Sequence, residues 1–302
     1  MPSLPARFFN HAVRLRIKRR RWGRDEQAVA RRARNLFGAP RVLAWFWSKG
    51  VDLQPVNEDE IRGEWIEPKK YDSQAVILYI HGGGFVSSSA RTHRPITTGL
   101  ARRTGLRVFA VNYRLAPEHR FPAGLDDVVV AYKWLLAQEI PAAKIALAGD
   151  SAGGGLVLSL LLRLRDAGLP LPACAVCFSP WTDLTGEDDS AGLDENRCAM
   201  FYLENCTEFA GAYLGGASPR DKYASPVFAD LGGLPPVLFQ VGSTELLLDN
   251  SRRVHEKIHS AGGTSELQIY DDVFHCWQML DGFVPEAGAA LQHAAEFIKC
   301  HI

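Results

Sequence analysis

One short stretch constrains the fold of this 302-residue chain more than any other. Residues 145–148 form an apolar run, residues 149–153 read GDSAG, and an apolar helical pattern follows over residues 156–164. The pattern predicts a strand, a sharp turn and a helix, with Ser151 in a strained backbone conformation at the turn. The flanking glycines leave room for neighbouring backbone, so the Ser151 hydroxyl should stand above the sheet edge, beside free N–H groups of the helix. A glycine-rich turn with an incidental serine is the alternative.

Eight apolar segments can form strands, and helical patterns separate most of them. The candidate strands are residues 51–56, 61–66, 75–80, 108–111, 145–148, 173–178, 237–241 and 266–269. The candidate helices are residues 91–103, 122–138, 152–167, 249–260 and 285–299. Strands that alternate with helices predict an α/β fold with a mostly parallel sheet covered on both faces. Residues 182–232 interrupt this alternation and are too long for a simple loop, so we predict an inserted cap there.

The total charge gives no indication of an acidic partner such as nucleic acid, because Lys plus Arg and Asp plus Glu number 34 each. Residues 1–34, however, contain eleven Arg or Lys and two acids, with a peak at residues 18–21. This helical segment is either a solvated helix face or a patch that contacts a membrane surface or nucleic acid. The aromatic residues 45–47 are expected to be exposed.

The chain shows no secretory signal and no apolar run long enough to span a membrane. We therefore expect a cytoplasmic protein without stable membrane insertion. Cys174 and Cys177 form a C-x-x-C inside an apolar run. Residues three apart on a strand face opposite sides, so a metal or redox pair is not expected there. Reduced cysteines fit the cytoplasm.

A second glycine-rich stretch, HGGGF at residues 81–85, directly follows a predicted strand. Consecutive glycines allow several backbone N–H groups to point at a negative charge that develops during a reaction. Gly83 and Gly84 are the candidate donors, and the N–H of Ala152 is the third. His81 is expected to brace the loop through hydrogen bonds. A phosphate-binding loop is the alternative, but no phosphate-loop or dinucleotide pattern accompanies the glycines.

A serine hydroxyl becomes a good nucleophile only when a base takes its proton. His275 is the favoured base, because it follows the last predicted strand, at the edge where parallel sheets bind ligands. The carboxylate that orients this histidine should follow the strand at residues 237–241. Glu245 is the candidate nearest the strand end, and Asp249 looks like a helix cap. Glu245 is therefore the favoured acid and Asp249 the alternative.

Four stretches together resemble the hormone-sensitive-lipase-like family of α/β-hydrolase esterases, also called bacterial family IV. They are residues 81–85 (HGGGF), 113–118 (YRLAPE), 121–123 (FPA) and 149–154 (GDSAGG). With the His275 loop they span about residues 60–302. The resemblance implies an eight-stranded α/β-hydrolase core with a helical cap. The core would comprise residues 49–181 and 233–302, and the cap residues 1–48 and 182–232.

The resemblance implies hydrolysis of short- to medium-chain carboxylic esters of small molecules without metal or cofactor. It implies a catalytic triad with Ser151 as nucleophile and His275 as base, and the oxyanion hole named above, with Asp150 in support. The family usually has an aspartate at the position of Thr244, so Glu245 fits only if the loop shifts by one residue. An amidase, a small-molecule deacetylase or a non-catalytic ligand-binding relative remains an alternative, and the protein is expected to be a monomer or a homodimer. A lipase attached to a membrane through residues 7–24 is a further alternative.

Overall fold

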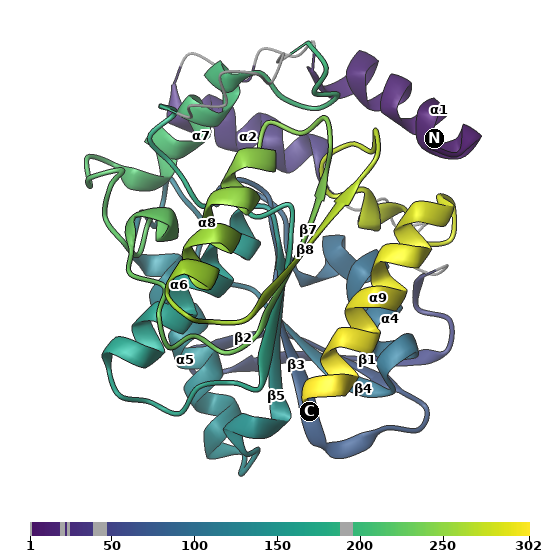
Figure 1. Ribbon diagram of the computed structural model, residues 1–302, viewed down its shortest axis with the longest axis vertical. Coiled ribbons are helices and arrows are strands. Elements are labelled where there is room, and N and C mark those ends of the chain that lie inside the picture. The colour runs from purple at the N-terminus through teal and green to yellow at the C-terminus, as the bar shows by residue number, and fades with distance from the viewer. Residues whose placement is uncertain (1, 19–21, 23–24, 39–46, 188–195) are drawn as a thin grey trace.

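An eight-stranded sheet runs through the centre of the computed structural model, which describes residues 2–18, 22, 25–38, 47–187 and 196–302 (Figure 1). The strand order is β1-β2-β4-β3-β5-β6-β7-β8. β2 is antiparallel to β1 and β4, and all other neighbouring strands are parallel. The strands are β1 (Val51–Glu58), β2 (Ile61–Pro68), β3 (Asp72–Ile80), β4 (Leu106–Val111), β5 (Ile145–Asp150), β6 (Cys174–Phe178), β7 (Val237–Gly242) and β8 (Ser265–Tyr270). The predicted α/β fold class is confirmed.

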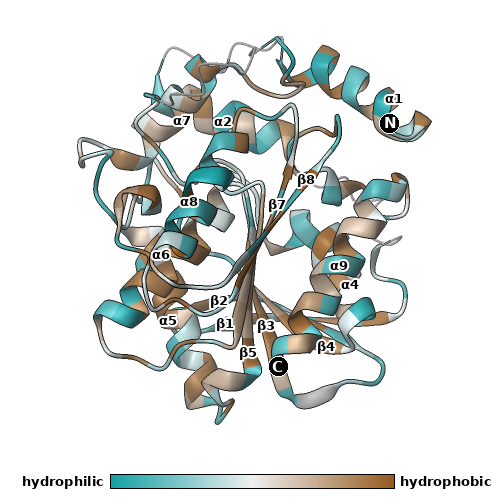
Figure 2. Cartoon of the chain, in the orientation of Figure 1, coloured by the Kyte–Doolittle hydropathy of each residue, from teal (hydrophilic) through white to brown (hydrophobic). Residues whose placement is uncertain are grey.

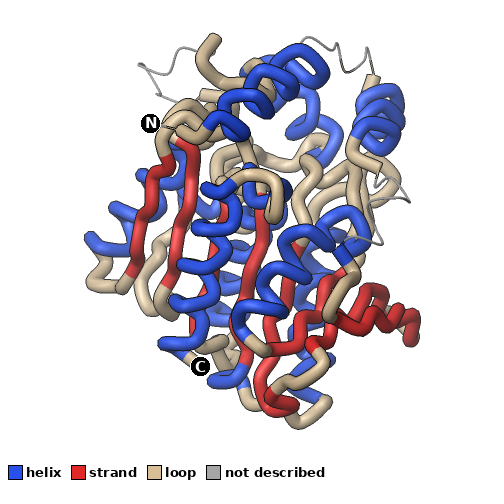
Figure 3. Tube along the Cα trace, turned by 90° about the vertical axis from the view of Figure 1, so that its right-hand side faces the viewer, coloured by secondary structure: helices blue, strands red, loops and turns tan. Residues whose placement is uncertain are grey.

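Helices cover both faces of the sheet, as the two views at right angles show (Figures 1 and 3). One face carries α4 (Arg94–Thr104) and α9 (Pro285–His301), and the other carries α5 (Ala123–Ala137), α6 (Ala152–Asp166) and α8 (Leu248–Ser260). Apolar residues of these helices and of the strands form two large core clusters. Figure 2 shows the hydrophobic colour concentrated on the strands and on the neighbouring helices. Cys174 and Cys177 lie in different clusters, so they face opposite sides of β6, as predicted.

Three further helices lie above the carboxyl ends of the strands (Figure 1). They are α1 (Leu4–Val13), which continues as a π-helical turn over Arg14–Lys18, α2 (Glu26–Leu36) and α7 (Leu203–Leu214). The predicted helical character of the N-terminal segment holds for α1 and α2, and α7 lies within the predicted insertion. The division of the chain into core and cap segments stays a prediction.

Element boundaries differ from the predictions by a few residues, each for a physical reason. β5 includes Gly149 and Asp150, because both still pair with β6. The helix predicted from residue 91 divides into a 3₁₀ turn over Ala90–His93 and α4, whose first turn contains a proline. Asp249 does not cap α8, because the helix begins at Leu248 and Asp249 lies inside its first turn.

Some sequence predictions concern residues that the structure does not describe. These are the basic residues Arg19, Arg20 and Arg21 and the aromatic residues Trp45 and Phe46. Trp47 of the same aromatic group is described and is buried, against the expectation of exposure. Within the described ranges, no helix combines the length and the apolar character that crossing a bilayer requires.

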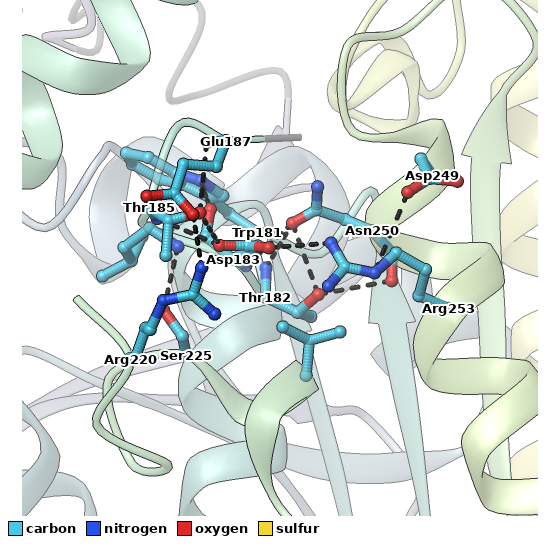
Figure 4. A network of polar contacts seen from close by, with 12 residues as sticks. Trp181, Thr182, Asp183, Thr185, Glu187, Arg220, Ser225, Asp249, Asn250 and Arg253 are labelled. Atoms are coloured by element: carbon cyan, nitrogen blue, oxygen red, sulfur yellow. Dashed lines mark hydrogen bonds and ion pairs between the residues drawn. The ribbon is translucent and has the colours of Figure 1, made fainter. Parts of the chain in front are cut away.

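A polar network attaches the first residues of the insertion to α8 (Figure 4). The buried Asn250 accepts hydrogen bonds at Oδ1 from the backbone N–H groups of Thr182 and Asp183, at 2.8 and 2.9 Å. The Asp183 carboxylate in turn pairs with Arg253 at 2.7 Å. Since the loop before α8 contains Glu245, this network connects the chain after β6 to the loop that carries the candidate acid.

Candidate active site

Ser151 occupies the turn between β5 and α6 with φ +52° and ψ −123°. This conformation is costly for a residue with a side chain, and it persists because the surrounding backbone enforces it. A Cβ at Gly153 would lie 2.1 Å from the carbonyl oxygen of Ile80, and one at Gly149 would lie 2.6 Å from that of Gly153. The two glycines are therefore required by close backbone approach, and the turn has the geometry that the motif predicts.

A continuous line of hydrogen bonds joins Ser151, His275 and Glu245. The Ser151 hydroxyl lies 2.8 Å from His275 Nε2, and His275 Nδ1 lies 2.7 Å from Glu245 Oε2. His275 and Glu245 are both buried, so little water competes for these bonds. The alternative acid, Asp249, faces Arg253 at 3.9 Å along the surface of α8. The structure thus brings together the serine, the histidine and the favoured acid of the sequence analysis.

The Glu245 carboxylate reaches the histidine by folding back over its own loop. Its Oε1 accepts hydrogen bonds from the Gly242 N–H at 2.7 Å and from the Ser179 hydroxyl at 2.8 Å. Ser179 is buried at the end of β6 and has φ +45°. Sequence reasoning missed this residue, although its place directly after a parallel strand was a usable signal, because side chains at such ends converge on one sheet edge.

The glycine loop lies beside Ser151 with backbone angles that favour glycine. Gly83 has φ +112° and Gly84 has φ +62°, and both line the same cavity as Ser151. The Gly83 carbonyl is fixed by the backbone N–H and the hydroxyl of Ser87, at 3.1 and 2.8 Å. Ala152 is the first residue of α6, where an N–H has no acceptor within the helix. The loop and the helix start therefore present backbone donors beside the serine.

His81 supports this loop from behind. Its Nδ1–H donates to the Gly82 carbonyl at 2.8 Å, and its ring stacks on Tyr113 with centroids 4.3 Å apart. The Tyr113 hydroxyl donates to the His81 carbonyl at 2.9 Å. Burial, together with the nearby His93, lowers the pKa of His81 to about 3. His81 is therefore neutral at physiological pH and is suited to bracing the loop.

Asp150 directly precedes Ser151, and its carboxylate holds the glycine loop. Its Oδ1 accepts from the Gly82 N–H at 3.0 Å and from the Tyr79 hydroxyl at 2.6 Å, while Oδ2 faces His93 Nε2 at 3.2 Å. Burial alone would raise the pKa of Asp150, but His93 and the two hydrogen bonds outweigh it and lower the pKa to about 2. The buried group is thus a carboxylate. Sequence reasoning did not find Tyr79 or His93, because no motif marks them.

An apolar cavity of about 280 Å³ opens at Ser151. Its wall includes Phe9, Val13, Ile17, Trp181, Phe201 and Phe209. Tyr202, next to Phe201 in the chain, is not part of this wall, because its exposed ring packs under the Lys18 ammonium at 4.4 Å. In the part of the chain that the structure describes, no group of three or more His, Cys, Asp or Glu side chains could hold a metal ion.

Comparison with known proteins places this chain in a family. The family of the α/β hydrolase fold matches residues 77–279. The chain is 40% identical to an acetyl-hydrolase of Streptomyces hygroscopicus, over 78% of this chain and 79% of that protein. It is 38% identical to an esterase of Acinetobacter venetianus, over 82% of each chain. A crystal structure of an esterase from the bacterial hormone-sensitive lipase family superimposes with a TM-score of 0.91 at 37% identity, covering 100% of this chain and 99% of that one.

The chain belongs to the hormone-sensitive-lipase-like family of α/β-hydrolase esterases. A hormone-sensitive lipase from a metagenome library is similarly close in structure, with a TM-score of 0.89 at 33% identity over 100% of this chain and 99% of that chain. This member of the family has Thr244 where an aspartate is usual. The Thr244 hydroxyl is directed to the Val273 carbonyl at 3.4 Å, and the next residue, Glu245, faces His275.

Proposed function

We propose residue roles for the reaction of this enzyme, a serine carboxylesterase or lipase-like hydrolase that acts on carboxylic esters of small molecules. Ser151 is the nucleophile, His275 the general base and acid, and Glu245 the carboxylate that orients the imidazole. The observation that carries the proposal is the unbroken hydrogen-bonded line between these three side chains, at 2.8 and 2.7 Å. This is the arrangement that an activated serine requires.

The reaction proceeds by acyl transfer. His275 Nε2 takes the proton of Ser151 as Oγ attacks the ester carbonyl, and the tetrahedral oxyanion accepts hydrogen bonds from backbone N–H groups. We assign these donors to Gly83, Gly84 and Ala152. His275 then protonates the leaving alcohol as the carbon–oxygen bond breaks. Water, deprotonated by His275, attacks the acyl-enzyme, and His275 then returns that proton to Ser151 Oγ as the carbon–oxygen bond breaks and the acid leaves. These steps use only side chains and backbone of this chain and water.

His81 and Asp150 hold the oxyanion loop in position. Asp150 accepts from the Gly82 N–H at 3.0 Å and is covalently next to Ser151, so it sets the distance between nucleophile and loop. His81 fixes the carbonyl of Gly82 from the other side at 2.8 Å. Neither side chain transfers a proton in this scheme, because His81 stays neutral and Asp150 stays ionised at the working pH.

The cavity supports an apolar acyl group of short to medium length. Its volume of about 280 Å³ is at the small end of small-molecule sites, and its wall is made mostly of apolar side chains. The names of relatives point to small acyl groups: one is an acetyl-hydrolase and another, from Pseudomonas putida, an ethyl acetate hydrolase. We assign residues 1–48 and 182–232 to a cap over this cavity, since Phe9 of α1 and Phe209 of α7 both line it.

Hydrolysis of p-nitrophenyl esters from acetate to palmitate by the wild type and by Ser151→Ala tests the proposal. We expect activity that peaks at short or medium chains and falls to background in the variant. A fold-intact wild type that is inactive on every ester would contradict the proposal and indicate a ligand-binding relative. Faster turnover of a matched amide than of its ester would indicate an amidase instead.

A further inference from the structure

The N-terminal helix α1 buries one face against the body of the enzyme. Ala6, Phe9, Val13 and Ile17 recur at the three- or four-residue spacing that places side chains on one side of a helix. Ala6 is buried, and the other three line the substrate cavity. The inner face of α1 and of the turn that follows it therefore forms part of the cavity wall. Packing against the rest of the protein therefore explains why Ala6, Phe9, Val13 and Ile17 are apolar.

The outer face of the same helix is also apolar. Leu4, Phe8 and Leu15 recur at spacings of four and seven residues, and 78%, 68% and 47% of their surfaces are exposed. A helix on the surface of a globular protein normally has polar residues on its outer side. A row of large exposed apolar side chains on one helix face marks a site of interaction. Phe8 packs edge-on against Phe9 with ring centroids 5.4 Å apart, yet 68% of its surface stays exposed, so this contact does not cover the outer face.

The charged side chains of this segment itself are all positive. Residues 2–18 contain Arg7, Arg14, Arg16 and Lys18 and no Asp or Glu. Arg7, Arg14 and Arg16 are exposed, and Arg14 also donates a hydrogen bond to the Arg197 carbonyl at 2.9 Å. A face that combines Phe and Leu with Arg fits the interface of an anionic bilayer, where apolar side chains enter the acyl boundary and the guanidinium groups contact lipid phosphates. This charge complementarity selects an anionic lipid surface as the occupant.

Polar contacts keep the outer face turned outward. The Ser3 backbone N–H and hydroxyl donate to the Glu286 carboxylate of α9 at 2.6 and 2.7 Å. Asn10 donates to the Asp272 carbonyl at 2.6 Å, and Lys18 donates to the Cys198 carbonyl at 2.8 Å. These contacts lie along the whole length of the segment, so the helix cannot turn its apolar outer row toward the core without losing them.

The exposed apolar side chains of the molecule concentrate near this helix. Eight large apolar side chains are exposed among the described residues, and Leu4, Phe8 and Leu15 are three of them. Tyr202 and Leu203 lie at the start of α7, where Lys18 contacts Tyr202, and Phe283 lies three residues before Glu286, the partner of Ser3. Figure 1 shows α1 and α7 at the same end of the molecule, above the sheet. Six of the eight exposed apolar side chains therefore belong to α1, the turn after it, or segments with residues that contact them or lie a few positions away.

We propose that the outer face of α1, defined by Leu4, Arg7, Phe8, Arg14 and Leu15, binds the enzyme to an anionic lipid surface. The inner face of the same helix lines the substrate cavity, so this contact holds the cavity at the lipid interface, where apolar esters accumulate. The enzyme lies on the surface and does not cross it.

Flotation of the full chain with vesicles tests this surface. The vesicles are phosphatidylcholine alone or phosphatidylcholine with about one third phosphatidylglycerol. We expect binding to the anionic vesicles only, and at least about tenfold weaker binding for Leu4→Ser/Phe8→Ser and for Arg7→Glu. Ile269→Ser, which removes from β8 an apolar side chain that is 43% exposed, about as much as Leu15 at 47%, is the control and should bind like the wild type. All variants should hydrolyse soluble p-nitrophenyl acetate at the wild-type rate.

Three results would overturn the proposal. One is that the wild type does not float with anionic vesicles at low salt, and another is that Leu4→Ser/Phe8→Ser floats as well as the wild type. The third is a dimer, detected by light scattering, that Leu4→Ser/Phe8→Ser dissociates, because a second copy would then occupy the face. Binding is measured without substrate, so the outcome is independent of the catalytic roles proposed above.

Discussion

The Ser179 hydroxyl donates a 2.8 Å hydrogen bond to Glu245 Oε1, from the end of β6 to the loop after β7. The other carboxylate oxygen of Glu245 faces His275. Two neighbouring strands thus hold one carboxylate, and the Gly242 N–H supplies a second bond to the same oxygen at 2.7 Å. The carboxylate that faces the histidine is therefore held by a serine that does not line the cavity.

Replacement of Ser179 by alanine should lower kcat with little change in KM. The lost hydrogen bond to a charged group is worth about 1.5–3 kcal/mol, which corresponds to a decrease in kcat of roughly tenfold to a hundredfold. The control is Ser225→Ala, which removes a buried hydroxyl that accepts from the Leu184 N–H at 2.8 Å, away from the proposed triad. It should lower stability and leave kcat unchanged. Equal kcat values for the two variants would refute the positioning role.

Replacement of Glu245 by glutamine should lower kcat by about 10³- to 10⁴-fold, because the amide cannot stabilise the imidazolium that forms during attack. Glu245→Asp should also be strongly impaired, since the shorter side chain cannot both reach His275 and keep its bond to the Gly242 N–H. Asp249→Asn should retain wild-type kinetics, because Asp249 faces Arg253. Steady-state kinetics on one p-nitrophenyl ester compare the three, and a larger loss for Asp249→Asn than for Glu245→Gln would reverse the assignment of the acid.

Replacement of Gly153 by alanine should abolish folding or greatly lower the free energy of unfolding. The new methyl group would lie 2.1 Å from the Ile80 carbonyl oxygen, in backbone that cannot move without displacing β3, so we expect a loss of more than about 3 kcal/mol. Gly168→Ala is the matched control, because Gly168 has φ +65° and no atom lies within 4 Å of the added methyl. It should cost about 1 kcal/mol. Urea unfolding measures both, and similar losses would show that close approach does not explain Gly153.

Stability should fall as the pH drops below the unfolded pKa of His81. The unfolded chain binds a proton near pH 6.5, whereas burial holds the native pKa of His81 at about 3. Between these values the unfolded state carries more protons, so this one residue lowers the free energy of unfolding by about 1.4 kcal/mol per unit of decreasing pH. His81→Asn should remove that contribution from the pH dependence of urea unfolding. An unchanged slope would show that His81 is protonated in the native state.

The sequence predicted the elements and their order because apolar runs, glycines and prolines act locally. The strand before Ser151 and the helix after it were recognisable from residues 145–164 alone, and the eight strands lie where the apolar segments are. The same logic located His275 and Glu245, since both follow strands whose carboxyl ends share one edge of the sheet. In the structure His275 lies within hydrogen-bond distance of both Ser151 and Glu245. The catalytic roles of these residues stay a prediction.

What the sequence could not predict depends on contacts between distant segments. Ser179, Tyr79 and His93 carry no motif, and each meets its carboxylate only after several strands have assembled. The Glu245 side chain folds back over its own loop because its carboxylate accepts a hydrogen bond from the Gly242 N–H. The positions of acidic residues in the sequence do not predict this conformation. The sequence also did not predict which apolar face of α1 is buried, because a helical pattern does not show which row of side chains packs against the rest of the protein.

Covalent labelling with phenylmethylsulfonyl fluoride tests the central claim most directly. The Ser151 oxygen should displace fluoride from sulfur, with His275 taking the proton, so that one sulfonyl group is added per chain. Mass spectrometry should locate the adduct on the peptide that contains Ser151, and esterase activity should disappear in proportion to labelling. Ser151→Ala should remain unlabelled, and Glu245→Gln should react much more slowly. Stoichiometric labelling of Ser151→Ala, or loss of activity with the adduct on another residue, would contradict the assignment of the nucleophile.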